Sequence, residues 1–62
     1  MLTKNQSQVL DFVKKYYEKY DYSPSLEEIR KKFKLASVST AHYYIKKLQE
    51  AGFLHLEALQ QN

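Results

Sequence analysis

The chain has 62 residues, a length that allows one small domain. Such a domain buries only about 60% of the surface of its unfolded chain, and it is too short for a Rossmann unit or a barrel. The composition, 44% hydrophobic and 27% charged, is typical of a globular protein, and the zero cysteines exclude disulfides and thiolate zinc sites. The net charge of +3 permits a polyanionic partner without requiring one. With no membrane span and no signal peptide in the sequence, we expect a cytoplasmic domain with no membrane partner.

The first predicted helix covers residues 3–20. Thr3 and Gln6 have the spacing of a capping box, in which a hydroxyl and an amide three residues later close the helix start. The motif at residues 21–24 ends the helix, because Pro24 disfavours helical backbone at the residue before it. Helical periodicity predicts one buried stripe along this helix, formed by Val9, Phe12, Val13, Tyr16, Tyr17 and Tyr20.

The second predicted helix covers residues 26–34. Ser25 and Glu28 form a second capping box, and Glu27 adds negative charge to the first turn, where the helix dipole favours it. The apolar positions Leu26, Ile29 and Phe33 face inward in this interpretation.

The third predicted helix covers residues 38–51, and Ser37 is placed to cap its free amides. Gly52 follows, where a left-handed glycine would close the helix. Residues 53–57 then predict a short strand, because they hold large apolar residues directly after a glycine. The buried stripe of the third helix consists of Ala41, Tyr44, Ile45 and Leu48.

The link between the second and third helices, residues 35–37, is so short that it predicts a helix-turn-helix unit. The second helix of such a unit enters the major groove of DNA, and its first residues meet the base edges. At about 100° per residue, the outward face of the third helix is centred on Ser39, Tyr43, Lys46 and Glu50. Thr40 and His42 lie on the flanks of this outward face. From geometry alone, DNA binding and an ordinary solvated helix face are equally good interpretations.

The outward residues have the chemistry that DNA requires. Serine and threonine hydroxyls bond to bases or phosphates, His42 can donate to guanine or phosphate, and Lys46 and Lys47 can neutralise phosphates. The ring of Tyr43 would be wasted in water unless a partner covers it. Ser25 is a further candidate phosphate contact at a helix start, although two neighbouring glutamates would weaken that contact by repulsion.

Catalytic and metal chemistry have almost no support in the sequence. The two histidines have neither cysteines nor clustered carboxylates beside them, so we expect no metal site and no cofactor. The carboxylates mostly lie on helix exteriors, and nothing marks a pocket. We therefore expect that the domain is not an enzyme.

The order and spacing of residues from Leu2 to about Leu56 resemble the N-terminal DNA-binding domain of LexA-type repressors. The resemblance implies a mostly α, three-helix winged helix-turn-helix fold, with a small antiparallel sheet after the third helix and a single domain over residues 1–62. It also implies a bacterial repressor, associated with the nucleoid, that binds double-stranded DNA at a palindromic operator. The matching positions are Leu2, Thr3, Gln6, Val9, Asp11, Ser23, Pro24, Ser25, Glu28, Ile29, Ser37, Ala41, Lys46, Leu48 and Gly52.

The resemblance also implies which residues contact DNA and where this chain departs from the family. Lys46 matches a family lysine for which a phosphate contact is implied. Family members commonly have asparagine at the Ser39 position and acidic residues at the positions of His42 and Tyr43, so we expect a different operator. Residues 58–62 offer no glycine-containing turn, so the wing is expected to be short, altered or truncated. The implied base-contacting positions are Ser37, Ser39, Thr40, His42 and Tyr43.

The 62 residues do not include the self-cleaving, dimerising domain of the larger family proteins, so we do not transfer autoproteolysis to this chain. Two interpretations stay open: an excised domain, or a small stand-alone regulator that dimerises weakly or not at all. A homodimer would have to form through missing or additional segments. The alternative function is a winged-helix module for protein–protein interaction, with Tyr43 and its neighbours as the contact patch.

Overall fold

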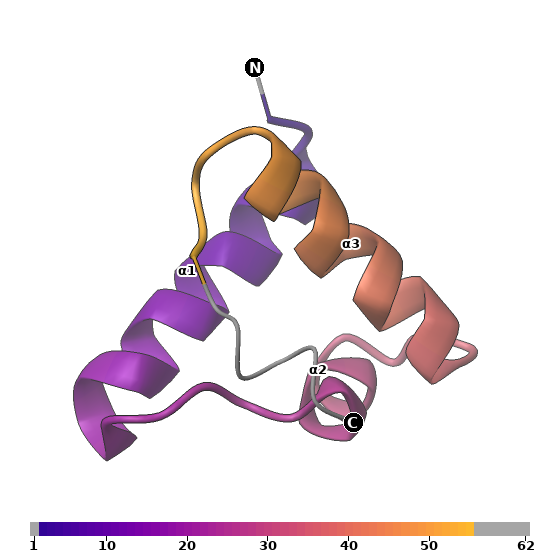
Figure 1. Ribbon diagram of the computed structural model, residues 1–62. Helices are drawn as coiled ribbons and strands as arrows, with labels where there is room; N and C mark the ends of the chain where they lie inside the picture. Colours follow the sequence, from indigo (N-terminus) through magenta and orange to yellow (C-terminus); the bar gives the residue numbers. More distant parts are fainter. Residues whose placement is uncertain (1, 56–62) are drawn as a thin grey trace.

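The computed structural model describes residues 2–55, which form three helices: α1 (Lys4–Tyr20), α2 (Leu26–Lys32) and α3 (Val38–Glu50). In Figure 1, α1 and α3 form the two long sides of a triangle, and α2 closes its base. The start of α1 and the end of α3 lie together at the apex. This arrangement confirms the predicted three-helix, helix-turn-helix fold, and none of these helices is long and apolar enough to cross a membrane.

The start of α1 is closed by the predicted capping box. The Thr3 hydroxyl accepts a hydrogen bond from the Gln6 N–H at 3.1 Å, and the Thr3 N–H donates to the Gln6 side chain at 3.0 Å. At the other end, Asp21 adopts a left-handed conformation with φ of 64° and donates its N–H to the Tyr17 carbonyl. The helix therefore stops before Pro24, as the sequence predicts.

The core is formed by inward residues of all three helices and by Leu54. This part of the interior is purely apolar, and among residues 2–55 no polar or charged side chain is buried. Ile29, Ala41 and Leu48 have no exposed surface, so α2 and α3 pack closely on each other. The buried set is Val9, Val13, Ile29, Ala41, Ile45, Leu48 and Leu54.

The predicted burial of the tyrosine stripe on α1 is wrong for two of its three tyrosines. Tyr16 is partly buried, but Tyr17 is 48% exposed and Tyr20 is 44% exposed. The Tyr16 ring packs against Phe12 at 5.9 Å and against Tyr22 at 5.8 Å between centroids, whereas Tyr17 lies about 100° further around the helix. Tyr20 lies in the last turn of α1, where its ring packs on Tyr16 at 4.5 Å and on Tyr22 at 6.1 Å between centroids.

The second helix ends earlier than predicted, at Lys32 rather than at residue 34. The Lys34 N–H donates to the Lys31 carbonyl at 3.3 Å, and the Leu35 N–H donates to the Arg30 carbonyl at 2.9 Å. This pair of bonds is the Schellman motif, which places its C′ residue in the left-handed region. Lys34 is that residue, with φ of 55°, and its conformation ends the helix.

The third helix ends in the same motif, with the predicted glycine at the left-handed position. The Gly52 N–H donates to the Gln49 carbonyl at 3.0 Å, and the Phe53 N–H donates to the Leu48 carbonyl at 2.9 Å. Gly52 has φ of 86°. The helix ends at Glu50, one residue before the predicted boundary.

The predicted strand over residues 53–57 is not found in its described part. Residues 53–55 are irregular, and no strand occurs anywhere between residues 2 and 55. Leu54 is buried in the core, and that part of the chain supplies no second strand with which it could pair. Residues 56 and 57, and the expected position of the wing at 58–62, lie outside the described residues.

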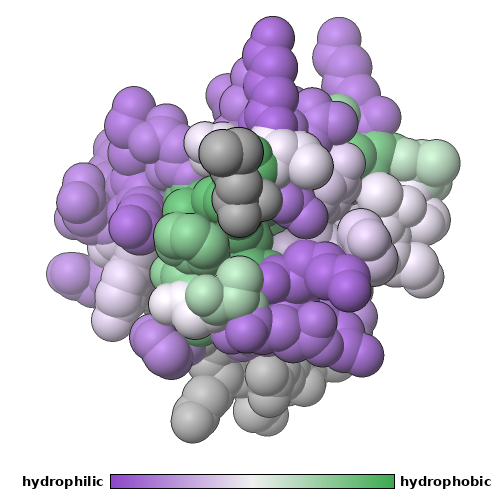
Figure 2. Space-filling view, turned by 90° about the horizontal axis from the view of Figure 1, so that it is seen from above, coloured by the Kyte–Doolittle hydropathy of each residue, from purple (hydrophilic) through white to green (hydrophobic). Residues whose placement is uncertain are grey.

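Figure 2 views the molecule from the apex of Figure 1, where the start of α1 and the end of α3 lie, and shows an apolar area bordered by hydrophilic side chains.

Candidate nucleic-acid interface

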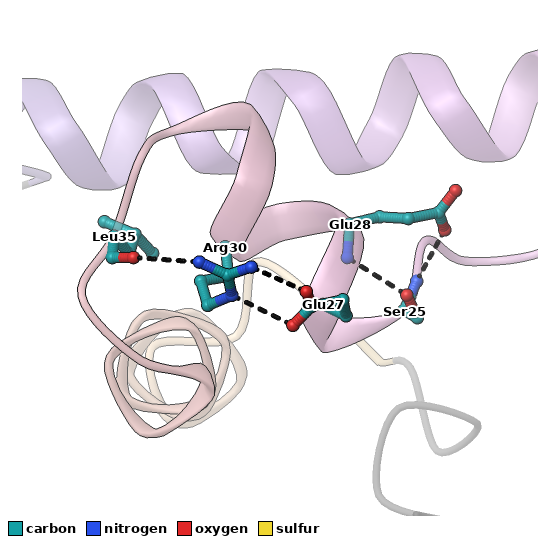
Figure 3. A network of polar contacts seen from close by, with 5 residues as sticks. All are labelled: Ser25, Glu27, Glu28, Arg30 and Leu35. Atoms are coloured by element: carbon teal, nitrogen blue, oxygen red, sulfur yellow. Dashed lines mark hydrogen bonds and ion pairs between the residues drawn. The ribbon is translucent and has the colours of Figure 1, made fainter.

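The turn that joins α2 to α3 is held by Arg30. Its guanidinium donates to the Leu35 carbonyl at 3.5 Å, and on its other side it donates twice to the Glu27 carboxylate, at 2.9 and 2.6 Å (Figure 3). The hydrogen bonds from Arg30 lower the pKa of Glu27, which stays charged at neutral pH. Arg30 therefore connects the first turn of α2 to the residue that leads into α3.

The inward face of α3 is the one predicted from periodicity. Ala41, Ile45 and Leu48 are buried, whereas Tyr44 is only partly buried. The Tyr44 hydroxyl accepts a hydrogen bond from the Asn5 amide at 3.4 Å, which links α3 to the start of α1. These contacts fix the rotation of α3 about its own axis and so determine which residues point outward.

The outward face of α3 holds the polar and cationic residues that the sequence analysis placed there. Ser39, His42, Lys46 and Lys47 are exposed. Tyr43 is 54% exposed, and Thr40 is half-buried on the flank. Their placement on one side of the helix follows the prediction, and their individual DNA contacts stay predictions.

Tyr43 does not stand alone on this face. The Lys47 ammonium lies 5.6 Å from the centroid of its ring, a cation–π distance, and the ring packs edge-on against Tyr44 at 6.0 Å. Lys47 also lies 3.8 Å from the Glu50 carboxylate. An exposed aromatic ring is thus presented in a defined position, with a cation beside it.

The start of α3 is built differently from the prediction. Ser37 occupies the N-cap position, but its side chain makes no capping hydrogen bond. Its hydroxyl lies 3.5 Å from the Thr40 hydroxyl instead, and only its carbonyl accepts a bond from the Thr40 N–H, at 3.2 Å. The first N–H groups of a helix have no intrahelical partner, so this start can offer amides and hydroxyls to an anion.

The start of α2 has the opposite character, because its capping box is complete. The Ser25 hydroxyl accepts from the Glu28 N–H at 3.1 Å, and the Ser25 N–H donates to the Glu28 carboxylate at 3.0 Å (Figure 3). The Tyr16 hydroxyl donates to the same carboxylate at 3.0 and 3.1 Å. The predicted phosphate contact of Ser25 stays a prediction, with a carboxylate directly beside it.

The same network shifts two ionisable groups in opposite directions. The backbone hydrogen bond from Ser25, followed by the bond from Tyr16, lowers the pKa of Glu28. Partial burial, followed by the bond to Glu28, raises the pKa of Tyr16 to about 12. At neutral pH the carboxylate is therefore ionised and the phenol is protonated, which is the combination that the hydrogen bond requires.

Sequence reasoning missed Arg30 and Asn5. A signal for Arg30 was present, because Glu27 lies three residues before it, the spacing of helical ion pairs. The bond from Asn5 joins residues 39 positions apart, and no local pattern indicates it. Between residues 2 and 55, no group of three or more histidine, cysteine, aspartate or glutamate side chains is arranged to hold a metal ion.

The fold and the outward face of α3 define a helix-turn-helix DNA-binding domain. The chain matches the family model of the LexA DNA binding domain over residues 1–61, and it belongs to this family. The resemblance inferred from the spacing of motifs is thus confirmed.

Relatives in the family are similar over most of this chain. The LexA repressor of Pelotomaculum thermopropionicum is 46% identical over 57 residues, which cover 92% of this chain and 28% of that protein. The LexA repressor of Petrotoga mobilis is 45% identical over 53 residues, covering 86% and 26%, and that of Staphylococcus epidermidis is 42% identical over the same length and shares. The chain thus spans about a quarter of the length of these relatives, and no solved structure matches it significantly.

Proposed function

We propose that this domain binds duplex DNA sequence-specifically and represses transcription in a bacterial cell. The observation that carries the proposal is the outward face of α3, which presents Ser39, Tyr43 and Lys46 on the second helix of a helix-turn-helix unit. Blocking access to a promoter needs affinity and a defined position on DNA, and it needs no chemistry at the site. Membership of the LexA family supports this function.

The residues divide into base readers and phosphate contacts by their position along α3. The first turns of a recognition helix lie deepest in the major groove, which assigns base reading to the hydroxyls, the imidazole and the phenol there. Lys46 and Lys47 follow later in the helix and suit phosphates, which position the protein without reading sequence. The proposed base readers are Ser37, Ser39, Thr40, His42 and Tyr43.

One α3 can read only one half-site, so a palindromic operator needs two copies of the domain. The half-sites for such a pair are about one helical turn apart. The net charge of +3 indicates modest affinity for a single copy, since phosphate neutralisation supplies much of the binding. We propose that dimerisation, where it occurs, uses segments other than this domain.

The first experiment selects bound duplexes from a random pool and then measures affinity for the best sequence as a function of salt. Several phosphate contacts predict a steep loss of affinity between about 50 and 200 mM salt. Binding that is indifferent to salt would favour the alternative, a protein-interaction module centred on Tyr43. Absence of salt-sensitive binding to any duplex would contradict the proposal.

The second experiment separates the two kinds of contact. Lys46→Ala is expected to weaken binding to all duplexes by a similar factor, whereas Ser39→Ala and Tyr43→Ala are expected to change the preferred sequence. Each variant is compared on the selected duplex and on duplexes with single base-pair changes. Equal, sequence-independent losses for all three variants would disprove the assigned roles.

A further inference from the structure

A groove of about 640 Å³ lies between the second half of α1 and the end of α2. Its apolar lining consists of four aromatic rings: Phe12, Tyr16 and Tyr20 from α1, and Phe33 from the residue after α2. The rings form a continuous series, with centroid distances of 5.6 Å between Phe33 and Phe12, 5.9 Å between Phe12 and Tyr16, and 4.5 Å between Tyr16 and Tyr20. None of its described lining comes from α3, so this surface is separate from the proposed DNA-reading face.

Three lysines line the same groove. The Lys19 ammonium lies 5.3 Å from the centroid of the Tyr20 ring, and the Lys32 ammonium lies 5.8 Å from that of Phe12. Lys15 is paired with Asp11 at 3.2 Å, the acidic residue of the described lining. Three cations against one carboxylate leave the groove positively charged, so a matching partner has to be acidic.

We propose that this groove binds an acidic segment of a partner protein. A large apolar side chain of the segment enters between the rings, and flanking carboxylates meet Lys19 and Lys32. Aromatic anchors of this kind, in pockets bordered by charge, are typical of the centre of protein interfaces. Tyr20, at 44% exposure, is the accessible ring on which such a side chain can pack.

The geometry favours an acidic peptide over a single-stranded nucleic acid, the other ligand that lysines and aromatic rings can bind. Base stacking needs free ring faces. Here one face of Phe12 and one face of Tyr20 have a lysine over them, and the contacts of Phe12 with Phe33 and Tyr16 are edge-to-face, which reduces the ring faces on which bases could stack. An apolar side chain needs only ring edges and the space between them.

The test measures binding of a fluorescein-labelled peptide, in which glutamates flank a central phenylalanine and leucine, to the full chain by fluorescence anisotropy. Tyr20→Ala is expected to weaken binding about fivefold, and the matched Tyr17→Ala, with 48% exposure but outside the groove, to leave it unchanged. Circular dichroism confirms that each variant is folded.

A second pair of variants tests the charge. Lys19→Glu with Lys32→Glu is expected to weaken peptide binding about tenfold, because both attractions become repulsions. Lys4→Glu with Lys14→Glu makes the same change in net charge outside the groove and is expected to have less than a twofold effect. Equal losses in the two double variants would overturn the proposal, because they would show attraction to net charge alone.

Three further results would also overturn it: no binding to the wild-type chain, equal binding of a peptide with alanines in place of phenylalanine and leucine, or tighter groove-dependent binding of single-stranded oligothymidine. Tyr20→Ala is expected to bind the selected duplex as the wild type does. The two proposals are therefore independent, and the failure of one leaves the other standing.

Discussion

The two helices of the helix-turn-helix unit end alike but begin differently. Both end in a Schellman motif, with Lys34 after α2 and Gly52 after α3 in the left-handed position. At their starts, Ser25 makes a complete capping box on α2, whereas the Ser37 side chain leaves α3 uncapped. The closed start belongs to the supporting helix and the open start to the proposed reading helix. The comparison indicates that α3 lacks a stabilising side-chain cap at the helix end where contact with DNA is proposed.

Changes at the two C-terminal turns are expected to give the largest effects, of opposite sign. Gly52→Ala should destabilise the domain by about 1–2 kcal/mol, the typical cost of a left-handed conformation for a residue with a Cβ atom. Apart from its two chain neighbours, no heavy atom of the described residues lies within 4 Å of the position of that Cβ, so we add no term for steric overlap. Lys34→Gly should stabilise it by up to about 1 kcal/mol by removing the same strain. Urea denaturation measures both, and effects of equal sign would show that the two turns are not equivalent.

The closed start of α2 is tested by Ser25→Ala. The variant loses the hydroxyl that accepts the Glu28 N–H, and we expect the free energy of unfolding to fall by about 1 kcal/mol. Thermal and urea denaturation followed by circular dichroism give this value. Ser25→Thr, which retains a hydroxyl, is the control and should recover most of the loss. Full stability in the alanine variant would mean that the capping box adds nothing to the fold.

The charge at the start of α2 predicts a smaller effect that depends on pH. Because the pKa of Glu28 is lowered in the folded state, the ionised carboxylate stabilises the fold above its unfolded pKa of about 4.3. That contribution is lost as the pH falls below this value and through the folded pKa. Glu28→Gln keeps an acceptor oxygen without the charge, so its melting temperature should fall less than that of the wild type between about pH 5 and 3. Parallel curves for the two proteins would contradict this role.

The open start of α3 predicts the smallest change in stability. Ser37→Ala removes no capping bond, so the free energy of unfolding should change by less than about 0.5 kcal/mol. Affinity for the selected duplex should nevertheless fall several-fold, because the variant loses a hydroxyl at the start of the proposed reading helix. A loss of stability as large as that of Ser25→Ala would show that Ser37 caps α3 in solution, and the contrast between the two helices would disappear.

Features that depend on neighbours in the sequence could be predicted. The capping boxes at Thr3 and Ser25 need residues three positions apart, and the buried face of α3 follows from its period. The same period predicts which residues of α3 face the core and which residues face outward, where the candidate site lies. Helix caps and helical periodicity depend only on residues that are close in the sequence, so both can be recognised from the order of the residues.

Features that depend on tertiary cover could not be predicted. The exposure of Tyr17 and Tyr20 follows from how much of α1 the rest of this small domain can cover, and their spacing does not contain that information. The early end of α2 rests on a lysine in a conformation that usually requires glycine, so no residue-type signal marks it. The base contacts proposed for the outward residues of α3 depend on DNA geometry, and the spacing of the residues does not specify them either.

The bonds of Arg30 have a consequence for how the specificity of this domain can change over evolution. The guanidinium stabilises the turn by donating to Glu27 and to the Leu35 carbonyl, and α3 packs on the core through its inward residues. Most of the proposed reading residues, such as Ser39 and Tyr43, are exposed and lie outside the buried core. Substitutions at these positions should therefore cost little stability, so single substitutions are expected to change the proposed operator preference while the domain stays folded.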